Sequence, residues 1–309
     1  MAFHRYERPA EIQGPAVYAM GTFDGVHLGH RALFDRAIAQ ARERGAQPLA
    51  LTFDPHPAKV LAPELAPPLL CTLARRLELM EEAGLAGALV LPFTRALAEL
   101  SPEAFVAEVL LPARALGVVV GYDFTFGRRR TGTPEVLQRL GRAHGFAVEV
   151  VPPVTLPGGI VPSSSKIREL VLEGRVEAAA TLLGRPFDID GTVVRGAGRG
   201  TKIGIPTANL EVDGELLPAA GVYATRAWLD GARVWPSVTN IGTVPTFNED
   251  EIVRIETHLI DWGGEALYGR RMRVAFAARL RGERRFSGPD ALRAQIREDI
   301  EVARRRLAG

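Results

Sequence analysis

Residues 15–54 read PAVYAMGTFDGVHLGHRALFDRAIAQARERGAQPLALTFD, and this stretch decides the fold of the N-terminal half. A short apolar run leads into a glycine-containing turn, a helical pattern follows, and a second apolar run ends the stretch. Strand, helix and strand in this order form a crossover unit whose two strands lie parallel in one sheet. The stretch therefore predicts a parallel sheet covered by helices.

The same alternation continues as far as Pro153. Beyond the opening stretch, the strand-like and helical runs are Arg75–Gly84, AGALVLPF, SPEAFVAEVLLPAR, LGVVVGYDF, GTPEVLQRLGRAHG and FAVEVVPPV. The segment KIRELVLEGRVEAAATLLG is predicted to be helical and to end at Gly184-Arg185-Pro186, because glycine and proline stop helices. Residues 1–183 are accordingly predicted to form a Rossmann-like α/β domain.

The pattern changes after Pro186. Short strand-like runs alternate with Gly, Pro and Asn, namely DIDGTVVRG, GVYATRAWLDG, ARVWPSVTNIG, IVRIETHLIDW and RRMRVAFAARLRG. Several short strands with turn signals between them predict a small antiparallel barrel, here residues 184–309. A C-terminal helix should follow, capped by Ser287 and packed through an apolar stripe of Leu292, Ile296, Ile300, Ala303 and Leu307.

Composition sets the broad class. The chain has 309 residues, 47% hydrophobic and 24% charged, and 38 basic against 36 acidic residues leave a formal net charge of +2. At ~150 residues per domain, this length predicts two domains. The balanced charge gives no field that would attract nucleic acid, so no nucleic-acid partner is expected. Oligomeric state is left open, with a homo-oligomer as one possibility.

Localisation follows from three observations. Cys71 is the only cysteine, so an internal disulfide is excluded and a reducing compartment is favoured. The charged N-terminal stretch has no apolar signal region, and no segment reaches the ~18 apolar residues that a membrane span needs. The sequence predicts a soluble, cytoplasmic protein without a membrane partner.

The motif GTFDGVHLGH, residues 21–30, is the first candidate site. Its three glycines let backbone approach a ligand closely, and the following helix N-terminus offers free N–H groups to phosphate. His27 and His30 lie three residues apart and should point the same way. Two neutral-to-cationic imidazoles beside a phosphate favour nucleotidyl transfer. Two alternatives are a capped helix with packed histidines, and a metal site with His56 as third ligand.

The glycine-rich segment GAGRGTKIGIPTAN, residues 196–209, is the second candidate site. Its glycines and basic side chains suit ATP phosphates, and the oxygens of Thr207 and Asn209 suit Mg²⁺. A glycine-rich hairpin followed by a turn is the alternative.

A carboxylate on the strand-like run IVRIETHLIDW completes that site. Alternation places Glu256, His258 and Ile260 on one face and Thr257 and Leu259 on the other. Glu256 can take a proton from an attacking hydroxyl group. The alternative is a surface glutamate paired with an arginine.

These motifs together resemble those of the bacterial bifunctional riboflavin kinase/FAD synthetases. GTFDGVHLGH is similar to the family's GxFDGxHxGH signature, and the family's PHP turn, GxxFxFG segment and SSTxIR motif appear as Pro55-His56-Pro57, GYDFTFG (121–127) and SSSKIR (163–168). Residues 184–309 resemble the six-stranded riboflavin kinase barrel, through PTAN (206–209) and ETH (256–258). Asp123, Ser165, Thr201 and Val244 depart from the family's usual Asn, Thr, basic residue and Arg.

The resemblance implies two reactions that both consume ATP. The C-terminal domain would phosphorylate riboflavin to FMN with Mg²⁺, and the N-terminal domain would transfer AMP to FMN, giving FAD and pyrophosphate. A riboflavin kinase with an inactive N-terminal domain, and a non-catalytic flavin- or nucleotide-sensing module, are the alternatives. Intact His27, His30 and Ser164 argue against the first, and Glu256 beside PTAN argues against the second.

The resemblance also assigns site residues. The catalytic groups are Glu256, His27 and His30. In the adenylyltransferase, ATP and its phosphates would be bound by Gly21, Phe23, Asp24, Gly25, His27, His30, His56, Ser163, Ser164, Ser165 and Arg168. The flavin would lie against Asp123 and Phe124. In the kinase, ATP and its phosphates would be bound by Gly198, Arg199, Gly200, Lys202, Thr207 and Asn209, the last two also holding Mg²⁺.

Overall fold

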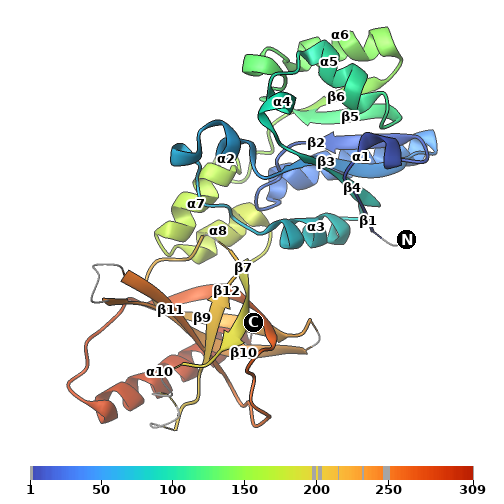
Figure 1. Ribbon diagram of the computed structural model, residues 1–309. Coiled ribbons are helices and arrows are strands. Elements are labelled where there is room, and N and C mark those ends of the chain that lie inside the picture. The colour runs from blue at the N-terminus through green and yellow to red at the C-terminus, as the bar shows by residue number, and fades with distance from the viewer. Residues whose placement is uncertain are drawn as a thin grey trace. The chain divides into compact units, whose positions relative to one another are not determined.

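The computed structural model describes residues 3–196, 200, 204–214, 216–231, 233–245 and 251–308, without the side chains of 243–245 and 251–252. Contacts divide the chain into two compact units (Figure 1). The N-terminal unit comprises Met1–Pro68 and Thr72–Ser163, and the C-terminal unit comprises Leu69–Cys71 and Ser164–Gly309. The two units are described separately below.

A six-stranded sheet forms the centre of the N-terminal unit. Its order is β1-β4-β3-β2-β5-β6, and every neighbouring pair is parallel. The strands are β1 (His4–Tyr6), β2 (Ala16–Met20), β3 (Gln47–Asp54), β4 (Gly87–Pro92), β5 (Ala115–Gly121) and β6 (Ala147–Val151). The Rossmann-like prediction is confirmed, although β1 was not foreseen. Because β3 and β5 flank β2 on opposite sides, the chain changes direction there, and ligands of such sheets bind beside the carboxyl ends of these strands.

Helices cover both faces of this sheet (Figure 1). Helices α1 (Leu28–Arg44) and α3 (Leu73–Glu82) pack with Val17 and Ala19 of β2. Helices α5 (Pro102–Phe105) and α6 (Pro134–His144) pack with Tyr18 on the other face. The short helical elements are η1 (Pro9–Glu11), α2 (Pro57–Leu61), η2 (Pro63–Leu65), α4 (Arg95–Ala98), η3 (Val106–Leu110) and η4 (Arg128–Arg130). Burial on both faces explains why the strands read as continuous apolar runs.

A closed antiparallel barrel forms most of the C-terminal unit, in the order β10-β11-β8-β7-β12-β9. Its strands are β7 (Phe187–Val194), β8 (Ala208–Val212), β9 (Gly221–Leu229), β10 (Arg233–Pro245), β11 (Glu251–Leu259) and β12 (Arg271–Arg281). Five of them were predicted from their runs. β8 was missed, because its first two residues were interpreted as the end of the PTAN motif.

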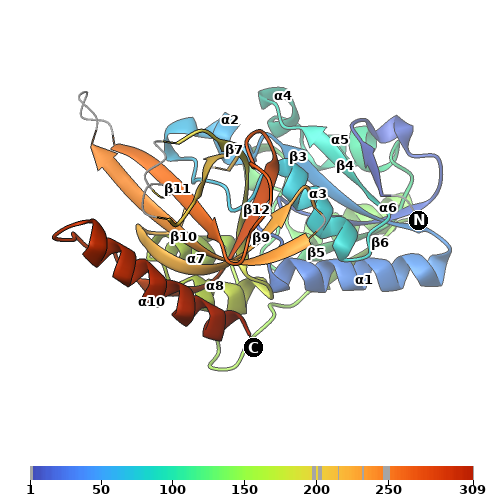
Figure 2. The same cartoon turned by 90° about the horizontal axis from the view of Figure 1, so that it is seen from below.

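The structure describes the bounds of three helices in the C-terminal unit. The predicted helix before the barrel is two helices, α7 (Ser164–Leu172) and α8 (Val176–Leu183), separated at Gly174 with φ of 72°. Helix α8 ends at Gly184, as predicted. Helix α10 (Pro289–Leu307) lies along β9, β10 and β12 (Figure 2), and part of its apolar stripe is buried there, namely Ile300, Ala303 and Leu307. None of the described helices has the length and apolar character needed to cross a membrane.

The predicted cap of α10 is wrong. The helix begins after Gly288, and no side chain caps it. Pro289 occupies the first turn, where its fixed φ suits a helix and its missing N–H costs nothing. Asp299, on the same helix, is instead buried and accepts hydrogen bonds from Arg281 at 2.8 to 3.1 Å. A buried ion pair therefore anchors α10 to β12.

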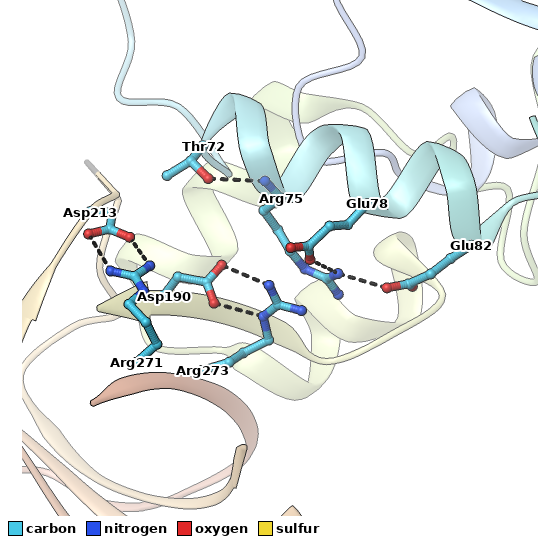
Figure 3. A network of polar contacts seen from close by, with 8 residues as sticks. All are labelled: Thr72, Arg75, Glu78, Glu82, Asp190, Asp213, Arg271 and Arg273. Atoms are coloured by element: carbon cyan, nitrogen blue, oxygen red, sulfur yellow. Dashed lines mark hydrogen bonds and ion pairs between the residues drawn. The ribbon is translucent and has the colours of Figure 1, made fainter. Parts of the chain in front are cut away.

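Ion pairs also join strands of the barrel and turns of α3 (Figure 3). Arg273 of β12 pairs with Asp190 directly opposite on β7, at 2.8 and 3.1 Å, and Arg271 pairs with Asp213 just after β8. In the N-terminal unit, Thr72 accepts a hydrogen bond from the backbone N–H of Arg75 and so caps α3. These contacts fix the ends of their elements.

The barrel interior holds a chain of hydroxyl groups. Thr225 contacts both Ser237 and Thr239 at 2.8 Å, and Thr239 contacts Thr257 at 3.0 Å. All four side chains are buried, and Ser237 also donates to the Thr225 carbonyl at 3.0 Å. The hydroxyls satisfy one another, which removes the usual penalty for burying polar groups.

Candidate active sites

The turn after β2 carries the first candidate site, and its backbone is strained. Phe23, Gly25 and Val26 have φ of 54°, 81° and 42°, a left-handed conformation that residues other than glycine rarely adopt. The Phe23 ring is buried and packs edge-on against Phe34 and His30, with centroids 4.8 and 5.2 Å apart. Such strain persists only where surrounding packing enforces it, and it concentrates at functional sites.

His27 caps α1. Its Nδ1 accepts a hydrogen bond from the backbone N–H of His30 at 3.4 Å, so the neutral ring carries its proton on Nε2. The side chain is buried, and burial lowers the pKa of His27 to about 4. Near neutral pH the ring is therefore an uncharged N–H donor.

His30 lies against His27, as the spacing predicted, with the two rings stacked at 3.6 Å between centroids. Burial holds the pKa of His30 well below its usual value, and the positive charges of His27 and Arg76 add to that shift. Its Nδ1 is buried without a hydrogen-bond partner. The two imidazoles were expected to be neutral or cationic, and these pKa shifts indicate that both are neutral near neutral pH.

Arg76 supports this turn from beneath and was missed in the sequence. Its side chain is 2% exposed, and Nη1 donates to the Thr22 carbonyl at 2.7 Å and more weakly to Thr52 and the Phe53 carbonyl, both at 3.4 Å. Asp54 is the nearest carboxylate, at 3.9 Å. A buried cation thus joins the turn after β2 to the end of β3. No local pattern could have shown it, because 54 residues separate Thr22 from Arg76.

Strand register builds the second candidate site. On β11, Glu256 lies opposite Asn209 of β8 on one side and Asn240 of β10 on the other. The neighbouring Ile255 and Thr257 are buried in the barrel, whereas Glu256 is half-buried on the outer face. Among the residues that the structure describes, Glu256 forms no ion pair, so the surface-pair alternative has no support. Two amides therefore flank a carboxylate that has no ion-pair partner in the described part of the chain.

His258 lies on the same face as Glu256, as predicted. Its Nδ1 donates to the carbonyl of Pro206 at 2.8 Å, because a carbonyl can only accept. This bond ties the strand that carries Glu256 to the turn that carries Thr207. Ile260 lies one residue beyond the end of β11 and packs beneath α10 in a cluster with Val238, the residue opposite His258, which agrees with the predicted facing.

Comparisons with known proteins identify the family. A family model described as FAD synthetase matches residues 10–165, and one described as riboflavin kinase matches residues 183–307. The bifunctional riboflavin kinase/FMN adenylyltransferase of Pseudomonas fluorescens is 39% identical over 93% of this chain and 92% of its own. The enzyme of the same name from Bacillus subtilis is 37% identical over 97% and 95%. This chain belongs to the bifunctional riboflavin kinase/FMN adenylyltransferase family.

A solved structure shares the fold of both units. It is described as a macrolide-efflux protein from Streptococcus pneumoniae, and it matches with a TM-score of 0.88 and 30% identity over 98% of this chain and 99% of that one. Each unit thus has an experimentally determined counterpart within one chain of similar length.

The remaining adenylyltransferase residues of the family pattern lie as follows. His56 caps α2 by accepting from the N–H of Ala58 at 3.2 Å. The described residues contain no group of three His, Cys, Asp or Glu side chains that could hold a metal, so a centre of His27, His30 and His56 is not formed. A side chain on Gly21 would press on the Phe23 ring at 3.0 Å. Asp24 is buried.

Two further loops contribute to this pattern. Pro162, just before Ser163, places its carbonyl 3.8 Å from the position that a Cβ on Gly29 would take. Ser164, Ser165 and Arg168 lie at the start of α7 in the C-terminal unit. After β5, Asp123 and Phe124 follow in an exposed turn, and the Phe124 ring stacks on Phe126 with centroids 5.8 Å apart.

The kinase pattern of the family has a glycine cradle. A Cβ on Gly196 would overlap the Asn209 carboxamide, and one on Gly200 would overlap the Ile205 carbonyl and lie 3.1 Å from the Thr207 hydroxyl. A cavity of about 270 Å³ opens there, lined by Val194, Arg195, Gly196, Asn209, Leu210, Val253, Arg254 and Ile255. Gly198, Arg199, Thr201 and Lys202 lie outside the described residues, as does the side chain of Val244.

Proposed function

We propose that this chain makes FAD from riboflavin in two ATP-dependent steps, each within one half of the chain. The observation that carries the proposal is the coexistence of two site geometries: the stacked, neutral His27 and His30 on a strained turn, and Glu256 between two strand amides. Family membership over both halves supports the same pair of activities.

In the first step Glu256 is the general base. It accepts the proton of the ribityl 5′-hydroxyl, whose oxygen attacks the γ-phosphorus of ATP, so that FMN and ADP form. The rigid strand holds the carboxylate in place, and the hydrogen bond from His258 to Pro206 holds the PTAN turn beside it. This contact makes His258 a positioning residue.

Thr207 and Asn209 would hold Mg²⁺ in this step. Their hydroxyl and amide oxygens are hard ligands, and the glycines at 196 and 200 let backbone lie against these two side chains, where a Cβ would collide or crowd. When bound, the ion neutralises charge on the ATP phosphates. Gly200 would contribute backbone to the same cradle, together with Gly198, Arg199 and Lys202.

In the second step an oxygen of the FMN phosphate attacks the α-phosphorus of ATP, and pyrophosphate leaves. The uncharged donors His27 and His30 stabilise the charge that develops on the α-phosphate, and a low dielectric strengthens such bonds. Glycines 21 and 25, Phe23, Asp24 and His56 would border the ATP phosphates, whereas Ser163, Ser164, Ser165 and Arg168 would receive the leaving group. The flavin would contact Asp123 and Phe124.

Chromatography of flavins tests the proposal directly. The full chain is incubated with riboflavin, ATP and Mg²⁺, and both FMN and FAD should accumulate. FMN without FAD would refute the adenylyl transfer, and unchanged riboflavin would refute both steps. Omission of Mg²⁺ from a matched reaction should stop FMN formation.

We also propose residues 1–183 and 184–309 as the two functional domains. A fragment of residues 184–309 should make FMN but no FAD. Helix α8 contacts β7 and β12, and Glu177 accepts from the backbone N–H of Arg279 at 3.1 Å. A fragment that begins at residue 164 should therefore melt at a higher temperature with the same activity. The lone Cys71 and the ATP requirement favour work in the cytoplasm.

A further inference from the structure

Residues 126–132 form a hairpin that the two proposed reactions leave without a role. Phe126 and Gly132 exchange backbone hydrogen bonds at 2.9 and 3.0 Å, and η4 (Arg128–Arg130) forms the tip. A Cβ on Gly132 would meet the Phe126 ring at 2.5 Å, so the strands of this arginine hairpin are tightly apposed. The tip is held by bonds from Arg130 N–H to the Gly127 carbonyl at 2.9 Å and from the Thr131 hydroxyl to the Arg128 carbonyl at 2.9 Å.

The backbone at the tip is strained. Arg129 has φ of 54° and ψ of 27°, and Arg130 has φ of 59°. The left-handed region is unfavourable for side chains with a Cβ, and here two consecutive arginines occupy it. Local strain of this kind calls for a function that it serves. At this tip, the strain projects three cationic side chains from one short turn.

The three charges are exposed, and the described residues provide them with no acidic partner. Within the described part of the chain, no carboxylate pairs with Arg128, Arg129 or Arg130, and the one side-chain bond is from Arg130 Nε to the Thr125 hydroxyl at 3.1 Å. Arg139 on α6 differs, because it pairs with Glu103 at 3.2 Å. Adjacent cations without counter-charges repel one another, and an anion that bridges them relieves that repulsion.

The position of the hairpin indicates which anion. It follows β5, whose carboxyl end lies beside that of β2, where the strand order reverses and ligands of such sheets bind. The loop after β2 carries His27 and His30, and the loop after β5 carries Phe124 and then the hairpin. Both nucleotide substrates bring phosphate to this edge. The direct continuity of Phe124 with the hairpin favours the flavin's phosphate over those of ATP.

We propose that the arginine hairpin binds the phosphate group of FMN for adenylyl transfer. The proposal rests on the second step of the proposed function. Guanidinium groups bind phosphate oxygens through paired N–H donors. The tip would hold two terminal oxygens of the FMN phosphate, and the third terminal oxygen would be free to attack ATP. The hairpin would also distinguish FMN from riboflavin, which carries no phosphate.

Kinetics of FAD formation from supplied FMN and ATP test this assignment in the full chain. Arg129→Asn removes the charge, and asparagine tolerates left-handed backbone better than most residues. Arg129→Lys keeps the charge. Arg139→Gln is the matched control, an exposed arginine of the same unit with a carboxylate partner. Riboflavin phosphorylation by each variant reports that the chain is folded and the other half active.

The expected result is a selective loss of FMN binding. Arg129→Asn should raise the KM for FMN about tenfold, the scale of one charge-assisted hydrogen bond, and leave the KM for ATP unchanged. Arg129→Lys should lie between that variant and wild type, and Arg139→Gln should match wild type. Riboflavin can also be tested as a competitor of FMN in FAD formation, in a Glu256→Gln background where riboflavin is scarcely phosphorylated. Its Ki should be the same with and without Arg129→Asn.

Three results would overturn the assignment. The first is an unchanged KM for FMN in both Arg129→Asn and the double variant Arg128→Gln/Arg129→Asn. The second is a Ki for riboflavin that rises in parallel with the KM for FMN, because the hairpin would then shape the ring site. The third is a rise confined to the KM for ATP, which would show that the hairpin binds the triphosphate of ATP. Absence of FAD from the wild-type reaction would instead refute the proposed function.

Discussion

The two candidate sites hold their reactive groups in opposite ways. In the N-terminal unit, His27 is buried and His30 is half-buried, and their uncharged rings stack on a strained turn supported by the buried Arg76. In the C-terminal unit, Glu256 lies half-exposed on a regular strand, placed by register between two amides. Packing and desolvation position the groups of one site, and the periodicity of a sheet positions those of the other.

The difference matches the chemistry proposed for each site. A hydrogen-bond donor to developing phosphate charge is most effective where water is excluded and the dielectric is low. A base that must be ionised before each turnover is better left hydrated, because burial disfavours a carboxylate's charge. The comparison therefore predicts that substitutions will act independently at the two sites and with different physical signatures.

The largest effect is expected at Glu256. Glu256→Gln keeps the shape of the side chain but removes the base, so FMN formation should fall by more than ~100-fold. Adenylylation of supplied FMN should be unaffected. Flavin chromatography with each substrate measures both rates, and Glu301→Gln on α10 is the matched control. Near-normal phosphorylation by Glu256→Gln would show that another group is the base, and the contrast between the two sites would then no longer apply to Glu256.

A change at His30 should reach a similar scale in the other reaction. His30→Ala removes a donor that the proposed reaction uses in its transition state, and such a loss costs ~3 kcal/mol, or about a hundredfold in kcat for FAD formation. Phosphorylation of riboflavin should stay normal. If His30 serves packing alone, the variant will melt earlier while its folded fraction keeps full turnover. His144→Ala, at the exposed end of α6, controls for loss of an imidazole.

A smaller effect is expected at His258, which acts through the PTAN turn. His258→Leu removes one hydrogen bond to Pro206 and should raise the KM for ATP in phosphorylation about fivefold to tenfold, with a lesser change in kcat. His258→Asn can donate from its amide near the position of Nδ1 and should restore most of the affinity. Equal losses in both variants would show that the contact does not position the turn.

The smallest effect concerns stability and pH. Folding lowers the pKa of His27 from the 6.5 of a solvated histidine to about 4, so the unfolded chain binds more protons between these values. Stability should be highest above about pH 6.5 and fall by about 1 kcal/mol from about pH 7 to 5.5 through this group, with His30 adding in the same direction. Denaturant titrations of wild type and His27→Asn measure the slope. If the unfolding free energy of His27→Asn changes with pH as steeply as that of wild type, the lowered pKa of His27 is refuted as the cause.

Sequence patterns predicted the regular parts of this protein. The strand and helix order of the N-terminal sheet, five barrel strands and the facing of Glu256 against Thr257 follow from apolar periodicity, which burial enforces. The stacking of His27 on His30 follows from helical spacing. β8 was not predicted, because its first two residues are also the end of PTAN and only three further residues show strand alternation.

The features that were missed depend on contacts between distant residues. In the sequence, Arg76 cannot be told from a surface arginine of an amphipathic helix. Only the fold shows that it donates to the carbonyls of Thr22 and Phe53. Ser287 has the side chain of a helix cap, yet Gly288 and Pro289 begin the helix. Ile260 continues the alternation of β11 one residue past its end, and only the packing of α10 over that face shows that the residue is buried. Tertiary packing decides each case.

The hydroxyl chain inside the barrel bears on how accurately Glu256 can be aligned. Thr225, Thr239 and Thr257 lie on β9, β10 and β11, and each finds its partner at one alignment of these strands. A slip of one residue between β10 and β11 would turn hydroxyls outward and bring aliphatic groups against the polar oxygens left behind. A barrel with a shifted strand register is therefore less stable, because its interior hydroxyls lose their partners. The interior hydrogen bonds thus help to keep Glu256 opposite Asn240 on the outer face.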